Sequence, residues 1–139
     1  MKALRFIIYG LIGWCIEIFW TGAGSLFSGD YSLSGYSSLW MFLIYGSVVF
    51  FEPIVDAVCT HSLWARGFIY VTLIFAVEFF SGYLLRRLVG SCPWNYSQAR
   101  FNIQGLIRLD YAPAWIIAGF AFEKLYLLLK RLRLDPRDT

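Results

Sequence analysis

The sequence is poor in the residues from which most metal centres and nucleophilic active sites are built. Among 139 residues it has one histidine, His61, and three cysteines, Cys15, Cys59 and Cys92. The cysteines lack the paired spacing of a zinc site, and no acid stands three residues before His61, as a di-iron helical bundle would require. A Ser-His-Asp or Cys-His arrangement is not indicated either. We therefore predict no cofactor, apart from a divalent cation that carboxylates alone would hold.

Charged residues are also scarce. They make up 15% of the chain, against roughly 25% in an ordinary soluble domain. Hydrophobic residues make up 59% and aromatic residues 20%, more apolar surface than a soluble chain of this length could bury. The basic residues flank apolar runs and form no stripe interleaved with exposed aromatics, which excludes a nucleic-acid-binding surface.

Four long apolar runs are separated by short polar segments. A membrane-crossing helix needs roughly 20 mostly apolar residues, so four such helices use nearly the whole chain. We therefore predict an all-α integral membrane bundle that forms a single transmembrane domain over residues 1–139. The four helices are expected at about 4–20, 39–58, 63–85 and 111–130. Pro53 lies inside the second run and predicts a kink there.

The distribution of lysine and arginine predicts the orientation. Four arginines belong to one side of the membrane: Arg86, Arg87, Arg100 and Arg108. Seven basic residues belong to the other: Lys2, Arg5, Arg66, Lys130, Arg131, Arg133 and Arg137. Both termini are therefore expected in the cytoplasm, in a plasma or inner membrane. Because the difference is modest, insertion in both orientations stays open, as does cleavage of the first run as a signal peptide.

Each predicted helix carries one glutamate within its apolar run: Glu17, Glu52, Glu78 and Glu123. At about 1.5 Å of rise per residue, all four lie within a layer about 10 Å thick around the middle of the bilayer. An ionised carboxylate at that depth costs at least about 2.5 kcal/mol. We therefore expect a carboxylate cluster that binds protons, cations or a cationic solute. The alternative is that each glutamate is protonated or hydrogen-bonded and only holds helices together.

Other residues are expected near this cluster. Asp56 lies one helical turn after Glu52 on the same face, where the two carboxylates could form an access path or hold Mg²⁺. Four aromatic residues could line the cavity and contact an organic cation: Tyr9, Trp14, Tyr45 and Tyr70. Core packing would explain these aromatic residues as well.

The chain contains a weak internal repeat. Tyr9 and Tyr70 each stand eight residues before a glutamate, Glu17 and Glu78 respectively, and the dipeptide Phe-Glu recurs in the second and fourth runs. This pattern predicts two copies of a helical hairpin, related by an axis along the membrane normal. Chance similarity between apolar aromatic segments is the rival explanation.

The connection between the third and fourth predicted helices is long and half apolar. It contains Trp94, Tyr96, Ser97 and Gly105. We expect this segment to fold back onto the bundle as a partly re-entrant loop, with Gly105 at a tight bend.

Several short motifs follow one another in a recognisable order: GWCIE at 13–17, SLW at 38–40, IYG at 44–46, EFFSG at 78–82 and FEKLY at 122–126. Together with the distinctive segment 92–109, they resemble the CmpB-like family of type IV ABC transporter proteins and the related vertebrate transmembrane protein 229 family. The family often has aspartate where this chain has Asn95. The resemblance implies a small polytopic membrane protein. Because no G-x-x-x-x-G-K-[ST] loop is present, ATP hydrolysis would need a separate ATPase subunit.

Three functions are compatible with these features. The first is a transporter- or channel-like protein, expected as a homodimer because four helices make only a thin wall. The second is a membrane-embedded enzyme for a lipid or other hydrophobic substrate, with two carboxylates as general acid and base or as Mg²⁺ ligands. The third is a non-catalytic membrane assembly partner.

Overall fold

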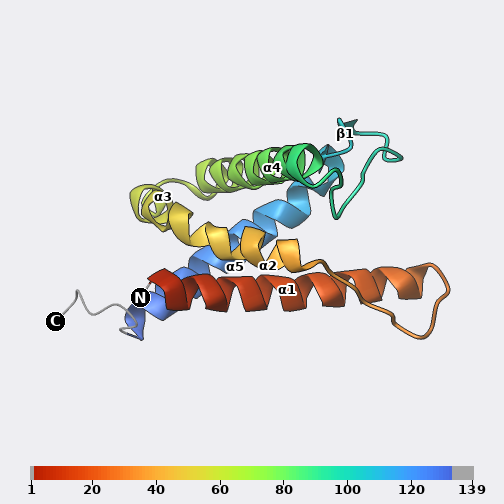
Figure 1. Cartoon of the computed structure of the whole chain (residues 1–139). Helices are drawn as coiled ribbons and strands as arrows, with labels where there is room; N and C mark the ends of the chain where they lie inside the picture. The colour runs from red at the N-terminus through yellow and green to blue at the C-terminus, as the bar shows by residue number, and fades with distance from the viewer. Residues whose placement is uncertain (1, 133–139) are drawn as a thin grey trace. The chain divides into compact units, whose positions relative to one another are not determined.

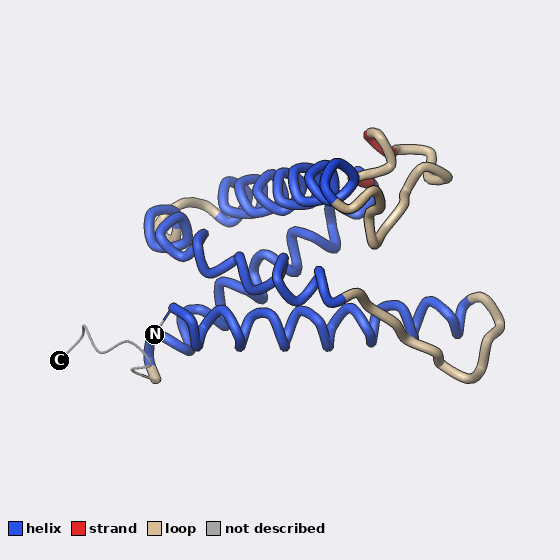
Figure 2. Tube along the Cα trace, in the orientation of Figure 1, coloured by secondary structure: helices blue, strands red, loops and turns tan. Residues whose placement is uncertain are grey.

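The structure, a computed structural model, describes residues 2–132. Four helical stretches are long and apolar enough to cross a membrane: Lys2–Phe27, Leu39–Val58, Leu63–Leu88 and Leu109–Arg131. The prediction of an all-α membrane protein with four transmembrane helices is therefore confirmed (Figure 2). Arg133 and Arg137, two of the residues used to predict the orientation, lie outside the described residues.

The chain divides into two compact units, Met1–Phe51 and Glu52–Thr139, which we call unit 1 and unit 2. Unit 1 contains α1 (Lys2–Phe27), α2 (Leu39–Ser47) and the 3₁₀ turn η1 (Val48–Phe51). In Figure 1, α1 and α2 lie side by side. A Cβ atom on Gly10 would lie 2.7 Å from the Phe42 ring, and one on Gly46 would lie 2.6 Å from the Phe6 ring. Each helix thus receives an aromatic ring of the other at a glycine, the close approach typical of membrane helices.

Helix α1 extends seven residues beyond the predicted end at residue 20. The added turns contain hydroxyl residues whose side chains bond to preceding carbonyl groups: Thr21 Oγ1 to Ile18 O at 3.1 Å and Ser25 Oγ to Gly22 O at 2.7 Å. These bonds satisfy polar side chains inside a helix. The helix ends before Gly29, whose φ of +85° suits a helix terminus.

Unit 2 contains three helices and a small sheet. The helices are α3 (Glu52–Val58), α4 (Leu63–Leu88) and α5 (Ala112–Arg131), and the 3₁₀ turn η2 (Leu109–Tyr111) precedes α5. Ser62 caps α4 by accepting a hydrogen bond from Ala65 N at 3.3 Å, and a proline stands in the first turn of α5, both common helix-start signals. The buried core comprises Val55, Val58, Tyr70 and Tyr126.

The second membrane-length stretch changes helix type just before Pro53. The 3₁₀ turn Val48–Phe51 separates α2 from α3. Pro53 has no N–H to offer the carbonyl of Val49, four residues earlier, so a regular α-helix cannot continue through this turn. The expected irregularity at Pro53 therefore takes the form of a turn of 3₁₀ helix.

The segment 91–111, which we call the lobe, connects α4 to α5. Strands β1 (Asn102–Ile103) and β2 (Ile107–Arg108) pair antiparallel within it. The turn between them passes through Gln104 and Gly105, with φ of +53° and +65°, as in the tight hairpin turns that favour glycine.

The lobe folds back along α4. Leu106 is fully buried, and a Cβ atom on Gly82 would lie only 2.7 Å from Leu106 Cδ2. Gly82 precedes the end of α4 by six residues, which corresponds to about 9 Å along the helix. The lobe therefore returns toward the apolar part of α4, as the expected re-entrant loop requires.

Candidate functional site

Glu123 on α5 is buried and is bound by two residues of α4. Arg66 Nε donates to Glu123 Oε2 at 3.1 Å, and Arg66 Nη2 donates to Oε1. The hydroxyl of Tyr70 donates to Oε2 as well. Both carboxylate oxygens are therefore satisfied by a bidentate guanidinium and a phenol, an arrangement that stabilises a buried carboxylate as an anion. The guanidinium also lies 5.2 Å from the centroid of the Phe120 ring.

The sequence interpretation assigned no site role to Arg66, and the internal repeat is the signal that could have found it. The pattern Arg-x₃-Tyr-x₇-Glu begins at Arg5 and occurs again 61 residues later at Arg66. Arg5 and Tyr9 are buried in unit 1, and Glu52 is buried at the start of α3. The repeat thus includes a buried arginine as well as the tyrosine and the glutamate, which argues against chance similarity.

Glu78 on α4 has a much poorer set of partners than Glu123. The hydroxyl of Tyr96, from the lobe, donates to Glu78 Oε1 at 3.4 Å. Oε2 is buried and has no hydrogen-bond partner within residues 2–132. The Trp115 indole lies close enough to interact with this carboxylate. Its Nε1 is nevertheless not aligned for a hydrogen bond and is also buried without a partner in that part of the chain.

Glu17 in unit 1 resembles Glu78. Tyr45 and Ser37 lie beside its carboxylate. Three polar atoms of this region are buried without a hydrogen-bond partner among the described residues: Glu17 Oε2, Ser37 Oγ and Trp14 Nε1. Trp14 precedes Glu17 by three residues and so shares its face of α1. Each unit therefore contains one carboxylate oxygen and one indole N–H that are buried and unpaired.

Within unit 2 the structure does not bring Glu78 and Glu123 together. Glu123 is bonded to Tyr70, which precedes Glu78 by eight residues on α4. Eight residues correspond to about 12 Å along a helix. The two carboxylates therefore lie at different levels of this unit and share no bonding partner.

Asp56 lies near the ends of α3 and α5. Its carboxylate accepts a hydrogen bond from the hydroxyl of Tyr126 at 2.6 Å and forms an ion pair with Lys130 Nζ at 3.2 Å. Its side chain is 46% exposed, whereas Tyr126 is buried. Asp56 thus connects the outer surface of unit 2 with its core.

Trp94, Tyr96 and Ser97 make different contacts within the lobe and with α4. Tyr96 reaches Glu78, while its backbone N–H donates to Gly105 O at 2.9 Å. Trp94 Nε1 donates to Leu106 O at 2.8 Å. Ser97 N donates to Asn95 Oδ1 at 3.0 Å. A side-chain oxygen is all that this last bond requires, so the asparagine at position 95 does here what an aspartate would do.

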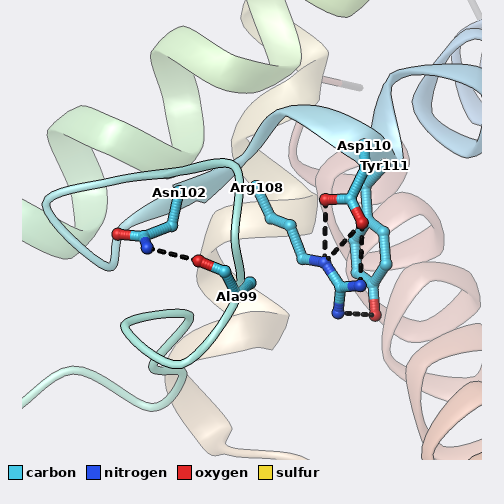
Figure 3. Close-up of polar contacts among 5 residues, drawn as sticks. All are labelled: Ala99, Asn102, Arg108, Asp110 and Tyr111. Atoms are coloured by element: carbon cyan, nitrogen blue, oxygen red, sulfur yellow. Dashed lines mark hydrogen bonds and ion pairs between the residues drawn. The ribbon is translucent and has the colours of Figure 1, made fainter.

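Arg108 bonds to Asp110 and Tyr111, the residues at the end of the lobe that lead into α5 (Figure 3). Its Nε and Nη2 both donate to Asp110, each at 2.8 Å, and its Nη1 donates to the hydroxyl of Tyr111 at 3.3 Å. The Tyr111 ring lies 5.9 Å from that of Tyr96 and 6.4 Å from that of Trp115. The rings of Tyr96, Tyr111 and Trp115 therefore form a continuous row, and the two residues at its ends, Tyr96 and Trp115, lie beside Glu78.

Within residues 2–132, no three His, Cys, Asp or Glu side chains converge in a way that could hold a metal ion. The arrangement instead offers two kinds of carboxylate within the helices. Glu123 is paired with a cation and a phenol, while Glu17 and Glu78 each keep one oxygen unpaired.

These features define a polytopic α-helical membrane protein. Residues 4–134 match the family described as "Putative ABC-transporter type IV". The chain belongs to this family, and the resemblance inferred from the motifs is thereby confirmed for the CmpB family. No solved structure matches the chain.

Proposed function

We propose that this protein is transporter- or channel-like and that Glu17 and Glu78 bind the proton or cation that moves. One observation carries the proposal: each of these glutamates has a buried carboxylate oxygen without a hydrogen-bond partner within residues 2–132. A buried carboxylate oxygen without a hydrogen bond makes the anionic form less favourable. Binding a proton or a cation removes that cost, so the site is suited to exchange.

Glu123 has a different role in this proposal. Its ion pair with Arg66 holds α4 and α5 together and leaves no oxygen for a mobile cation. Glu52 occupies the equivalent position of the repeat and is buried at the start of α3. Asp56, exposed at one end of unit 2, serves as the access point on the side of the chain termini.

The family description supports a membrane-transport context, and several further proposals depend on it. Because the chain contains no phosphate-binding loop, any ATP hydrolysis is supplied by a separate ATPase subunit. The protein forms a homodimer, because four helices alone do not complete the wall of a transport pathway. Both termini face the cytoplasm of a plasma or inner membrane.

The proposal can be tested with purified protein in liposomes that contain a pH-sensitive dye. A potassium diffusion potential drives proton entry, and flux is compared between the parent and the variants Glu17→Gln and Glu78→Gln. We expect both variants to fold and their flux to fall to the level of empty liposomes. The matched control is Asp30→Asn, which removes a carboxylate from the exposed loop after α1 and should leave flux unchanged. Parental flux in both glutamine variants would disprove the proposal.

Two alternatives remain proposals. The hydrogen bond between Tyr96 and Glu78 would suit a general acid and base acting on a lipid substrate, with or without Mg²⁺ held jointly by protein and substrate. The Arg66–Glu123 pair would suit an assembly partner whose acids only join helices. Chemical change of a co-purified lipid, followed by mass spectrometry, would favour the enzyme. An absence of flux in the parent, with loss of folding in the glutamine variants, would favour the assembly partner.

A further inference from the structure

The end of unit 2 formed by the last turn of α4 and the lobe is strongly basic. Residues 86–111 contain four arginines but only one carboxylate, that of Asp110. Two of the arginines are used to build the lobe. Arg108 binds Asp110 and Tyr111 (Figure 3), and Arg86 Nη1 donates to Gln104 O at 2.7 Å.

The other two arginines, Arg87 and Arg100, bond to no carboxylate within residues 2–132. Both are exposed. The guanidinium of Arg87 lies 5.4 Å from the centroid of the Tyr83 ring, and its Nε donates to the Tyr83 hydroxyl at 3.1 Å. The guanidinium of Arg100 lies 5.4 Å from the centroid of the Phe101 ring. Each exposed guanidinium is therefore supported by a neighbouring aromatic ring and pairs with no carboxylate of residues 2–132.

Apolar side chains are exposed beside these arginines. Phe101 is 54% exposed, Ile103 41% and Leu109 44%. Arg87 is the penultimate residue of the third membrane-length helix, Leu63–Leu88, so it lies where the hydrocarbon core gives way to the headgroups. A surface that combines unpaired arginines with exposed apolar residues is suited to that interfacial layer.

We propose that this surface, formed by Arg87, Arg100, Phe101, Ile103 and Leu109, binds the phosphate groups of anionic phospholipids. The guanidinium groups match phosphate oxygens in a bidentate geometry, and the apolar residues enter the acyl boundary beside them. The proposal is independent of the transport function. The bond from Arg86 to Gln104 O ties the lobe, which carries Arg100, to the last turn of α4, which carries Arg87.

Native mass spectrometry of the full chain with equimolar dioleoyl-phosphatidylglycerol and dioleoyl-phosphatidylcholine tests the proposal. At a lipid-binding surface each basic residue that contacts the headgroup contributes about fivefold to the affinity for anionic lipid. We expect phosphatidylglycerol to be preferred in the parent, and the preference to fall about fivefold in each of Arg87→Gln and Arg100→Gln. Arg131→Gln, the same change at an exposed position in the last turn of α5, is the matched control.

Equal binding of the two lipids by the parent would overturn the proposal, as would an unchanged preference in the variant that combines both substitutions. Complete competition by soluble glycerol 3-phosphate would also overturn it, because the site would then recognise a free phosphate ester. Should a glutamine variant fail to fold, the charge-preserving variants Arg87→Lys and Arg100→Lys replace it. Each lysine variant should retain part of the preference, and a parental level in both would contradict the bidentate role of arginine.

Discussion

The buried ion pair between Arg66 and Glu123 makes a quantitative prediction about stability. Replacing Glu123 with glutamine leaves the guanidinium without a counter-ion and turns one hydrogen-bond acceptor into a donor that faces it. Breaking a buried pair by removing one partner costs about 3–5 kcal/mol in soluble proteins.

The position of Arg66 reduces that value. Arg66 is the fourth residue of α4, and its side chain is 16% exposed. A long arginine side chain near a helix end can extend toward the headgroups and recover part of its solvation. We therefore expect Glu123→Gln to lower the free energy of unfolding by about 2–3 kcal/mol. Tyr70→Phe, which removes one neutral donor, should cost about 0.6–1.7 kcal/mol.

A double-mutant cycle separates the pair from its surroundings. Unfolding by denaturant in detergent is measured for the parent, Glu123→Gln, Arg66→Gln and the double variant. The double variant should be more stable than the sum of the single losses predicts, with a coupling energy of about 2 kcal/mol, because neither charge remains unpaired. A coupling energy within about 0.5 kcal/mol of zero, the error of additivity, would refute this account of the pair.

Two further predictions concern the lobe, and a third concerns the orientation in the membrane. The substitution Gly82→Val adds a side chain whose Cβ would lie only 2.7 Å from Leu106 Cδ2. It should therefore detach the lobe from α4 and accelerate tryptic cleavage after Arg100. Adding Leu106→Ala should slow that cleavage again. Burial raises the pKa of the Cys92 thiol, so less of it is present as thiolate at pH 7.5. A maleimide should therefore modify Cys92 more slowly than the exposed Cys59. The difference in rate should shrink as the pH rises. In intact cells an impermeant maleimide should reach Cys92 and not Cys59, and the opposite pattern would reverse the predicted orientation.

The long apolar runs made the helices predictable from the sequence. Apolar runs separated by Gly-Ser or arginine-containing segments leave little choice of fold in a bilayer. The end of α1 was harder to predict, because Thr21 and Ser25 look like loop residues until their hydroxyl groups are seen to bond to helix carbonyls. Pro53 signalled an irregularity but could not specify a 3₁₀ turn.

The lobe was only partly predictable. Its aromatic, apolar character indicated that it folds back, and glycine at 105 indicated a tight turn. The contacts that place it depend on Leu106 entering the space above Gly82, and on Arg86 reaching Gln104 O. No periodicity in the sequence reports such contacts, because they join positions from 18 to 24 residues apart.

The partners of the glutamates were the least predictable feature, for a geometric reason. Glu78 lies 12 residues past Arg66 and Glu123 lies 12 residues past Tyr111, so depth counted from the two membrane boundaries gives them similar levels. The partners depend instead on how two antiparallel helices align. Glu123 meets the first turns of α4, where Arg66 and Tyr70 stand.

Glu78, by contrast, lies beside the first turns of α5, where Trp115 is the nearby polar side chain, and beneath Tyr96 of the lobe. The same residue type thus forms a bidentate ion pair in one place and, among residues 2–132, keeps one oxygen unpaired in the other. If transport depends on a carboxylate that can change partners, Glu78 can serve and Glu123 cannot. The second copy of Arg-x₃-Tyr-x₇-Glu therefore contains two separate elements: Arg66 and Tyr70, which bind Glu123 on the next helix, and Glu78, which accepts its hydrogen bond from Tyr96 of the lobe instead.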